Sequence, residues 1–101
     1  MPAGKKKITR EDAIFTIGYD GSAALVDKSA RKNFGRLSLA ELLEKGLFRA
    51  AAAAAMDSGK REDLQAVAEA YNAVSGSSYK SESIPRLFGV AKVTVNRVLA
   101  L

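Results

Sequence analysis

The sequence predicts an α+β fold that is mainly helical, with an N-terminal β-hairpin followed by four to five helices. Three observations indicate this class. Apolar and polar residues alternate before Asp20-Gly21, and a second apolar run follows it, as in a hairpin. Leucines, valines and alanines then recur at helical spacing between residues 38 and 74. Near the C-terminus, two short apolar sets flank Gly89, which favours two helices joined by a turn.

Composition places the chain among globular proteins, and its length predicts one domain. It has 101 residues, of which 48% are hydrophobic and 27% charged. We expect a flexible basic arm over residues 1–12 and a single compact domain over residues 13–101. Three segments follow one another within that domain. They are a hairpin with a basic turn (13–36), an alanine-rich helical pair (37–59) and a three-helix unit (60–101).

The residue types that are missing limit the chemistry. The chain has neither Cys nor His, which excludes disulfides and zinc fingers and removes the commonest general base. No apolar stretch is long enough to span a membrane, and the basic start lacks the apolar core of a secretory signal. Adjacent acids such as Glu11-Asp12 point apart on a helix. We therefore expect a cytoplasmic protein that is not an enzyme and uses no cofactor, metal or membrane.

Residues 13–36 predict the hairpin and then the basic turn. Asp20-Gly21 supplies the turn between the strands, because a two-residue hairpin turn needs positive φ. The return strand is expected over residues 23–26. A two-stranded ribbon is marginal by itself, so it must pack on helices or pair with a second copy. The segment 28–36 carries four cations around Phe34 and is expected to form a helical turn or a loop.

Three helices are expected in the middle of the chain. Ser38 and Glu41 form an S-x-x-E capping box that opens the first of them. The second runs from Leu47 to Met56 and contains six consecutive alanines, which allow neighbouring helices to approach closely. It is expected to be a central buried helix or half of a dimer interface. The third, from Arg61 to Val74, has one apolar and one charged face.

The segment 83–99 carries the most specific pattern in the chain. Pro85 is tolerated only in the first turn of a helix, so a short helix must start near Ile84, and Gly89 ends it. A second helix is expected to bury the residues that recur at helical spacing, which are Val95, Val98 and Leu99. This arrangement resembles the helix-turn-helix of lac-repressor-type bacterial transcription regulators. The resemblance implies that the second helix enters the DNA major groove.

The polar residues of that second helix are the predicted DNA contacts. Arg97 is expected to pair with guanine and Asn96 with adenine, because these side chains match those base edges bidentately. Val93 is expected to contact a thymine methyl group, and Thr94 or Lys92 to hold a phosphate. Arg86 and Lys80 would flank the site.

The net charge of +5 is distributed unevenly along the chain. Eight Lys and Arg against four Asp and Glu give residues 1–36 a charge of +4, and four against one give residues 77–101 a charge of +3. The basic ends suit contact with a polyanion, although the same charges also fit a solvated surface. The predicted auxiliary phosphate contacts are Lys5, Lys6, Lys7, Arg31 and Lys32.

Two functions of different classes fit these observations. The first is a small DNA-binding protein, a transcription regulator that binds double-stranded DNA as a homodimer. A dimer is expected because one recognition helix reads too few base pairs for useful specificity. The second is a non-catalytic protein–protein interaction or dimerisation module, which the hairpin edge and the alanine-rich helix suggest.

Overall fold

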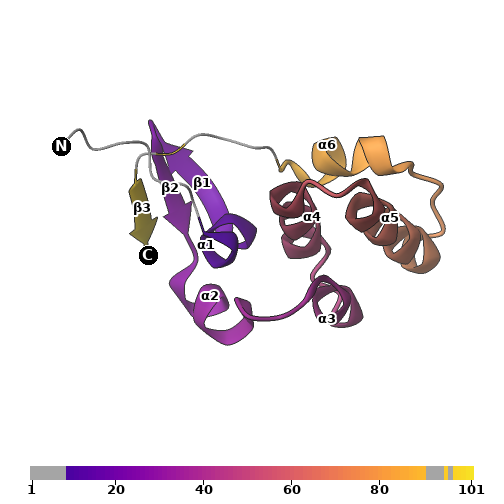
Figure 1. The fold of residues 1–101 in the computed structure, drawn as a ribbon, viewed down its shortest axis with the longest axis horizontal. Coiled ribbons are helices and arrows are strands. Elements are labelled where there is room, and N and C mark those ends of the chain that lie inside the picture. The colour runs from indigo at the N-terminus through magenta and orange to yellow at the C-terminus, as the bar shows by residue number, and fades with distance from the viewer. Residues whose placement is uncertain (1–8, 91–94, 96) are drawn as a thin grey trace. The chain divides into compact units, whose positions relative to one another are not determined.

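The computed structural model describes residues 9–90, 95 and 97–101, and the chain forms two compact units. Unit 1 combines Met1–Arg36 with Val93–Leu101, and unit 2 is Leu37–Lys92. The class is α+β, as predicted, with helices in both units and a three-stranded sheet in unit 1 (Figure 1). The boundary between the units falls where the basic segment ends and the capping box begins.

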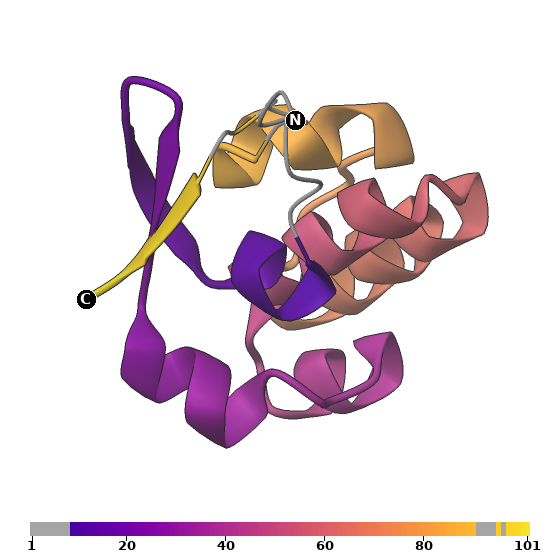
Figure 2. The ribbon, with the colours of Figure 1, turned by 60° about the vertical axis from the view of Figure 1, so that its left-hand side comes forward.

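Unit 1 is built around its sheet, in which β2 is the central strand. β2 runs antiparallel to β1 and parallel to β3, so the C-terminal residues return to the same unit as the hairpin (Figure 2). Three of its four apolar residues are buried, with Ala23, Ala24 and Val26 all at 0% exposure. In chain order, the elements of unit 1 are α1 (Arg10–Ile14), β1 (Thr16–Asp20), β2 (Ala23–Val26), α2 (Lys28–Phe34) and β3 (Arg97–Ala100).

Helix α1 begins inside the segment that was predicted to be a flexible arm. Thr9 caps it by accepting a hydrogen bond from the backbone N–H of Asp12 at 3.3 Å. Ile14 at the end of the helix is buried. The prediction of an arm is therefore wrong for residues 9–12, because a cap and one buried apolar side chain fix this short helix. The remainder of the predicted arm, residues 1–8, lies outside the described residues.

The hairpin is confirmed in part: residues 13 and 14 of its predicted first strand belong to α1, and the turn residues differ from those predicted. Asp20 is the last residue of β1 and pairs with Ala23, so the two turn residues are Gly21 and Ser22 and not Asp20-Gly21. Gly21 has the positive φ, 60°, that such a turn needs. The register also shifts between Thr16 and Gly18, which leaves Ile17 as a bulge opposite no residue of β2.

Unit 2 is helical, and its central helix is the alanine-rich one. Ala50 to Ala55 are all buried, and this helix packs against three others, α3, α5 and α6. Methyl side chains allow those helices to approach closely on several sides, which confirms the prediction of a central buried helix. The elements of unit 2 are α3 (Leu39–Glu44), α4 (Phe48–Ser58), α5 (Arg61–Ser75), the 3₁₀ turn η1 (Ser81–Ser83) and α6 (Ile84–Phe88).

The predicted start of α3 is confirmed in detail. The Glu41 backbone N–H donates to Ser38 Oγ at 3.2 Å, and the Ser38 backbone N–H donates to Glu41 Oε1 at 3.1 Å. This capping box satisfies two backbone donors that the helix leaves unpaired. Its hydrogen bonds from Ser38 also lower the pKa of the Glu41 carboxyl, since they favour the charged form.

A cluster of aromatic rings joins α4, α5, α6 and the loop after α5. Tyr71 contacts Phe48 and Phe88 edge to face, at centroid distances of 5.3 and 5.1 Å. It also contacts Tyr79, so the loop after α5 packs its ring against this cluster. Asn72 holds the loop by donating to the Tyr79 carbonyl at 2.8 Å and accepting from its N–H at 2.9 Å.

Only the first half of the predicted C-terminal motif is observed as a helix. Helix α6 runs from Ile84, with Pro85 in its first turn, and ends at Gly89, whose φ is 66°. The second predicted helix is wrong at its end, because residues 97–100 form β3 and pair in parallel with β2. Over so short a run, the spacing of the valines is compatible with a helix and with a strand. β-branched residues favour a strand when a buried strand lies beside them. The three-helix unit predicted for 60–101 therefore ends in a strand of the other unit.

Candidate nucleic-acid interface

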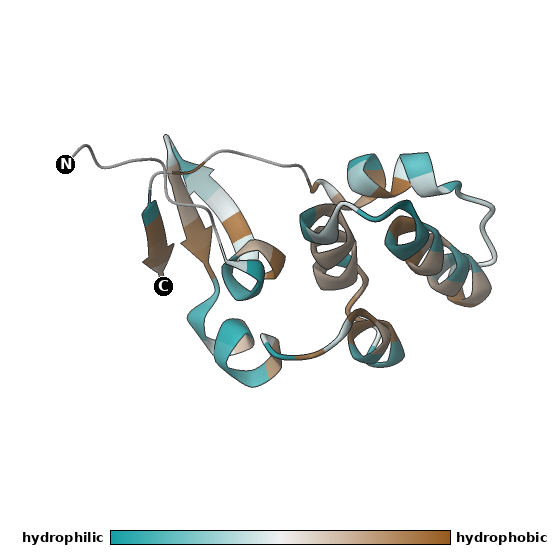
Figure 3. Ribbon diagram, in the orientation of Figure 1, coloured by the Kyte–Doolittle hydropathy of each residue, from teal (hydrophilic) through white to brown (hydrophobic). Residues whose placement is uncertain are grey.

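Helix α2 of unit 1 presents a group of positively charged side chains. Asp27 caps this helix by accepting from the backbone N–H of Ala30 at 3.1 Å. Residues 28, 31 and 32 stand at spacings of three and four, so they share one side of the helix. On another side, Phe34 anchors the helix, with its ring 6.4 Å from that of Phe15. Figure 3 shows α2 as hydrophilic over most of its length.

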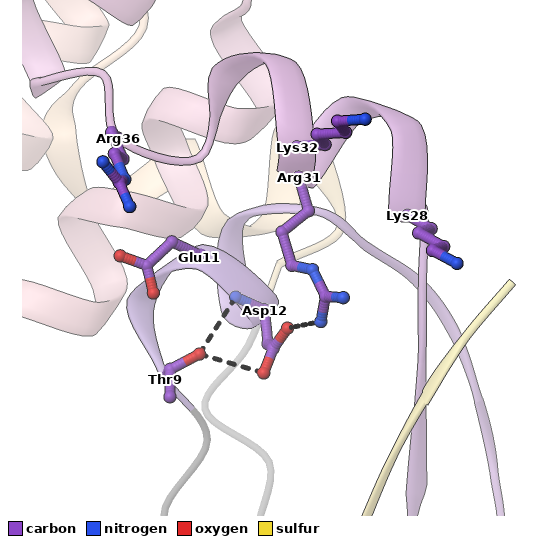
Figure 4. Close-up of a pocket in the computed structure, with 7 residues that line it drawn as sticks. All are labelled: Thr9, Glu11, Asp12, Lys28, Arg31, Lys32 and Arg36. Atoms are coloured by element: carbon purple, nitrogen blue, oxygen red, sulfur yellow. Dashed lines mark hydrogen bonds and ion pairs between the residues drawn. The ribbon is translucent and has the colours of Figure 1, made fainter.

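The cations border an open depression of about 750 Å³ between α1 and α2 (Figure 4). Four cations and two carboxylates line it, so the surface carries a net positive charge. Lys28 and Lys32 extend from the same side of α2, and Arg36 lies at the opposite end from Lys28. The lining residues are Thr9, Glu11, Asp12, Lys28, Arg31, Lys32 and Arg36.

One of the four cations is held inside the depression by an ion pair. Arg31 Nη1 donates to Asp12 Oδ1 at 2.5 Å, and the two side chains are 32% and 14% exposed. The other oxygen of Asp12 accepts from Thr9 Oγ1 at 2.9 Å. Asp12 therefore links the cap of α1 to α2 and fixes the direction of the Arg31 guanidinium. A second hydrogen bond joins α1 to the end of α2, because the Gly35 carbonyl accepts from Arg10 Nη1 at 3.4 Å.

The other three cations are free to bind an external anion. Lys28, Lys32 and Arg36 are exposed, and none forms an ion pair within the part of the chain that the structure describes. Exposed Lys and Arg without a carboxylate partner can contact a phosphate without first breaking an internal bond. This separates them from Arg31, for which a phosphate must compete with Asp12.

The described residues of the two units differ in net charge. Unit 1 has six Lys and Arg against four Asp and Glu among them, a charge of +2, and unit 2 has six against seven, a charge of −1. The net positive charge of the described residues therefore belongs to unit 1. The exposed ion pair between Arg61 and Glu82 in unit 2, at 3.3 Å, uses one of its cations internally. The Ser81 hydroxyl lowers the pKa of the Glu82 carboxyl, and Arg61 adds to this effect.

The described residues among the predicted contacts fall in both units. Arg31 and Lys32 come together in the depression, and Arg97 lies exposed on β3 of the same unit, opposite Ala23. Arg86, on α6, and Lys80, just before η1, are exposed in unit 2. The other predicted contacts lie outside the described residues. They are Lys5, Lys6, Lys7, Lys92, Val93, Thr94 and Asn96.

Two cations of the depression, Lys28 and Arg36, were not among the predicted contacts. Lys28 is four residues before Lys32, so helical spacing alone would have grouped the two lysines on one side. Arg36 follows the helix, and no local pattern shows that it borders the same hollow. Its place depends on α1, which the sequence did not predict.

Among residues 9–90, 95 and 97–101, no group of three or more Asp and Glu is placed to hold a metal ion. No helix in these same ranges is long and apolar enough to cross a membrane. Comparisons of the chain with protein-family models, with curated proteins and with solved structures find no match.

Proposed function

We propose that this protein binds nucleic acid, double-stranded DNA in the first instance, through phosphate contacts from unit 1. The observation that carries the proposal is the location of charge. Among the described residues, the net positive charge lies in unit 1, at +2 against −1 in unit 2, and three exposed cations without ion pairs stand together there. Neutralising phosphates and releasing their counterions supplies most of the affinity in binding of this kind.

The geometry favours contacts to the DNA backbone over base reading. Helix α2 has seven residues, roughly 10 Å at 1.5 Å per residue, so it offers a short row of cations and not a long groove-filling helix. Lys28 and Lys32 are one turn apart on it and act as point charges that tolerate many orientations of a phosphate. Backbone contacts position a protein on DNA and carry no sequence information directly.

The role of transcription regulator rests on the C-terminal resemblance and is proposed on that ground alone. Helix α6, the left-handed Gly89 and the exposed Arg86 supply the first helix, the turn and one cation of such a motif. Arg97 belongs to a strand, so in our proposal it contacts a phosphate and does not pair with guanine. Homodimerisation is proposed with it, because two copies double the number of phosphate contacts.

The experiment that tests the proposal is a salt titration with paired charge variants. Anisotropy of a labelled 20-base-pair duplex is followed from low to physiological salt. For Lys28→Gln/Lys32→Gln, we expect weaker binding and a log–log salt slope that is shallower by about two. The control Lys45→Gln/Lys60→Gln removes the same charge from exposed positions of unit 2 and should leave the slope nearly unchanged.

Two results would overturn the proposal. Absence of binding at low salt removes nucleic acid as the ligand. Equal losses in the two double variants mean that total charge matters and that the α2 surface has no particular role.

A second candidate is the non-catalytic interaction module, and one observation favours it. Ile17 and Tyr19 on β1 are 59% and 47% exposed, which is high for large apolar side chains on an edge strand. Light scattering with and without duplex separates the two functions. An assembly that forms without DNA and is indifferent to it supports the module.

A further inference from the structure

β1 is an edge of the sheet that lacks the usual protection against pairing. The strand order is β1-β2-β3, so one side of β1 has no strand partner among the described residues. Its residues Thr16–Asp20 include no Lys, Arg or Pro, and the only charge stands at the last position. The opposite edge, β3, begins with the exposed Arg97, a charge of the kind that discourages edge-to-edge pairing.

Some backbone N–H and C=O groups of β1 point away from β2. Asp20 and Ala23 flank the two-residue turn, so they form the hydrogen-bonded pair that closes it. Such pairs alternate along antiparallel strands, which turns the N–H and C=O of Tyr19 outward. The bulge leaves Ile17 opposite no β2 residue. The outer side of β1 thus offers donors and acceptors beside two exposed apolar side chains.

We infer that β1 pairs antiparallel with β1 of a second copy of this chain, about a two-fold axis at Gly18. In that register, Ile17 of each copy lies opposite Tyr19 of the other, twice, on the same face of the joined sheet. Thr16 lies opposite Asp20, and its hydroxyl stays bonded to the Asp12 carbonyl at 2.7 Å. The reciprocal contacts between Ile17 and Tyr19 make the strand complementary to itself.

Charge selects the antiparallel arrangement over a parallel one. The two copies of Asp20 stand at opposite ends of the antiparallel pair, whereas a parallel pair in register would place them side by side. The contact joins two five-residue strands and is small, so we expect a weak dimer with a dissociation constant of about 10 µM to 1 mM. The interface uses no cation of α2 and is independent of the proposed DNA contact.

The chain has no cysteine, which allows a direct test by single-cysteine crosslinking. Gly18 pairs with itself at a Cα separation of about 4.5 Å, within the range that a disulfide spans. A side chain at this position meets only Leu25 Cδ1, at 3.9 Å, so Gly18→Cys is compatible with the fold. We expect it to form a disulfide dimer at least about ten times faster than Val74→Cys, a control that is 69% exposed in unit 2.

A second measurement does not depend on disulfide chemistry. Sedimentation over a wide concentration range should show a reversible dimer of the unmodified chain, and Tyr19→Lys should weaken it by about tenfold or more. Val74→Lys is the matched control and should leave it unchanged, with circular dichroism confirming that both variants are folded. Equal crosslinking rates for the two cysteine variants, or a monomer at all concentrations, would overturn the inference.

Discussion

Gly35 is required because of the space it leaves and not because of its backbone angles. Its φ is −63°, a value that any residue adopts. A Cβ at this position would lie 2.4 Å from the Arg31 carbonyl oxygen and 3.1 Å from Glu11 Cγ. The Glu11 side chain can move aside, but the carbonyl is backbone and accepts the Gly35 N–H at 2.9 Å. We therefore predict that Gly35→Ala disrupts the end of α2 and its contact with α1.

The size of this effect follows from two opposing contributions. Overpacking of this kind costs about 1–3 kcal/mol. Replacing Gly by Ala reduces the entropy of the unfolded chain and returns about 0.4–1 kcal/mol. The net loss is about 1–2 kcal/mol, and each kcal/mol lowers the unfolding midpoint by about 4–8 °C in a domain of this size.

The control for this prediction is Gly18→Ala in the same unit. A Cβ there meets its nearest atom at 3.9 Å, so only the favourable contribution remains and stability should rise slightly. Thermal unfolding gives the midpoints, and amide hydrogen exchange gives the location. In Gly35→Ala, exchange should accelerate over residues 9–14 and 28–36 and stay unchanged over 61–75. If Gly35→Ala is as stable as Gly18→Ala, the steric argument is refuted.

Three further predictions concern other contacts. Asp12→Asn releases Arg31, so duplex affinity should rise several-fold and the salt slope should steepen by about one, measured by anisotropy; weaker binding contradicts this. Asn72→Ala removes both hydrogen bonds to Tyr79 and should lower unfolding free energy by about 1–2 kcal/mol in urea titrations; no change would mean that packing alone holds the loop. The pKa of Glu41 is lowered in the folded state, so its stabilisation is present above its ordinary value of 4.5 and is lost as pH falls through the lowered value. Glu41→Gln should therefore reduce the fall in midpoint between pH 5 and about pH 2, and an unaltered pH profile would refute the linkage.

Elements with local signals were predictable from the sequence. Ser38 and Glu41 carry the whole capping signal within four residues, and the glycines that stop α5 and α6 act on their own turns. The alanine-rich helix has the highest intrinsic propensity and is buried as expected.

Elements that depend on distant partners were not predictable. β3 exists because residues 97–100 pair with β2, which lies near the other end of the chain. Helix α1 is five residues long, too short for periodicity to separate it from the first strand of the hairpin. The candidate site depends on distant partners in the same way. Arg31 and Lys32 were identified from charge alone, whereas Arg36 joins them only through the packing of α1 on α2.

DNA binding by the α2 surface of unit 1 can be tested by locating the contact on the chain. Backbone amide resonances of the ¹⁵N-labelled chain are followed while an unlabelled 20-base-pair duplex is added at low salt. We predict shifts concentrated in residues 28–36, with residues 39–75 nearly unchanged. Shifts confined to residues 39–90, or no shifts at any duplex concentration, would mean that the α2 surface does not bind DNA.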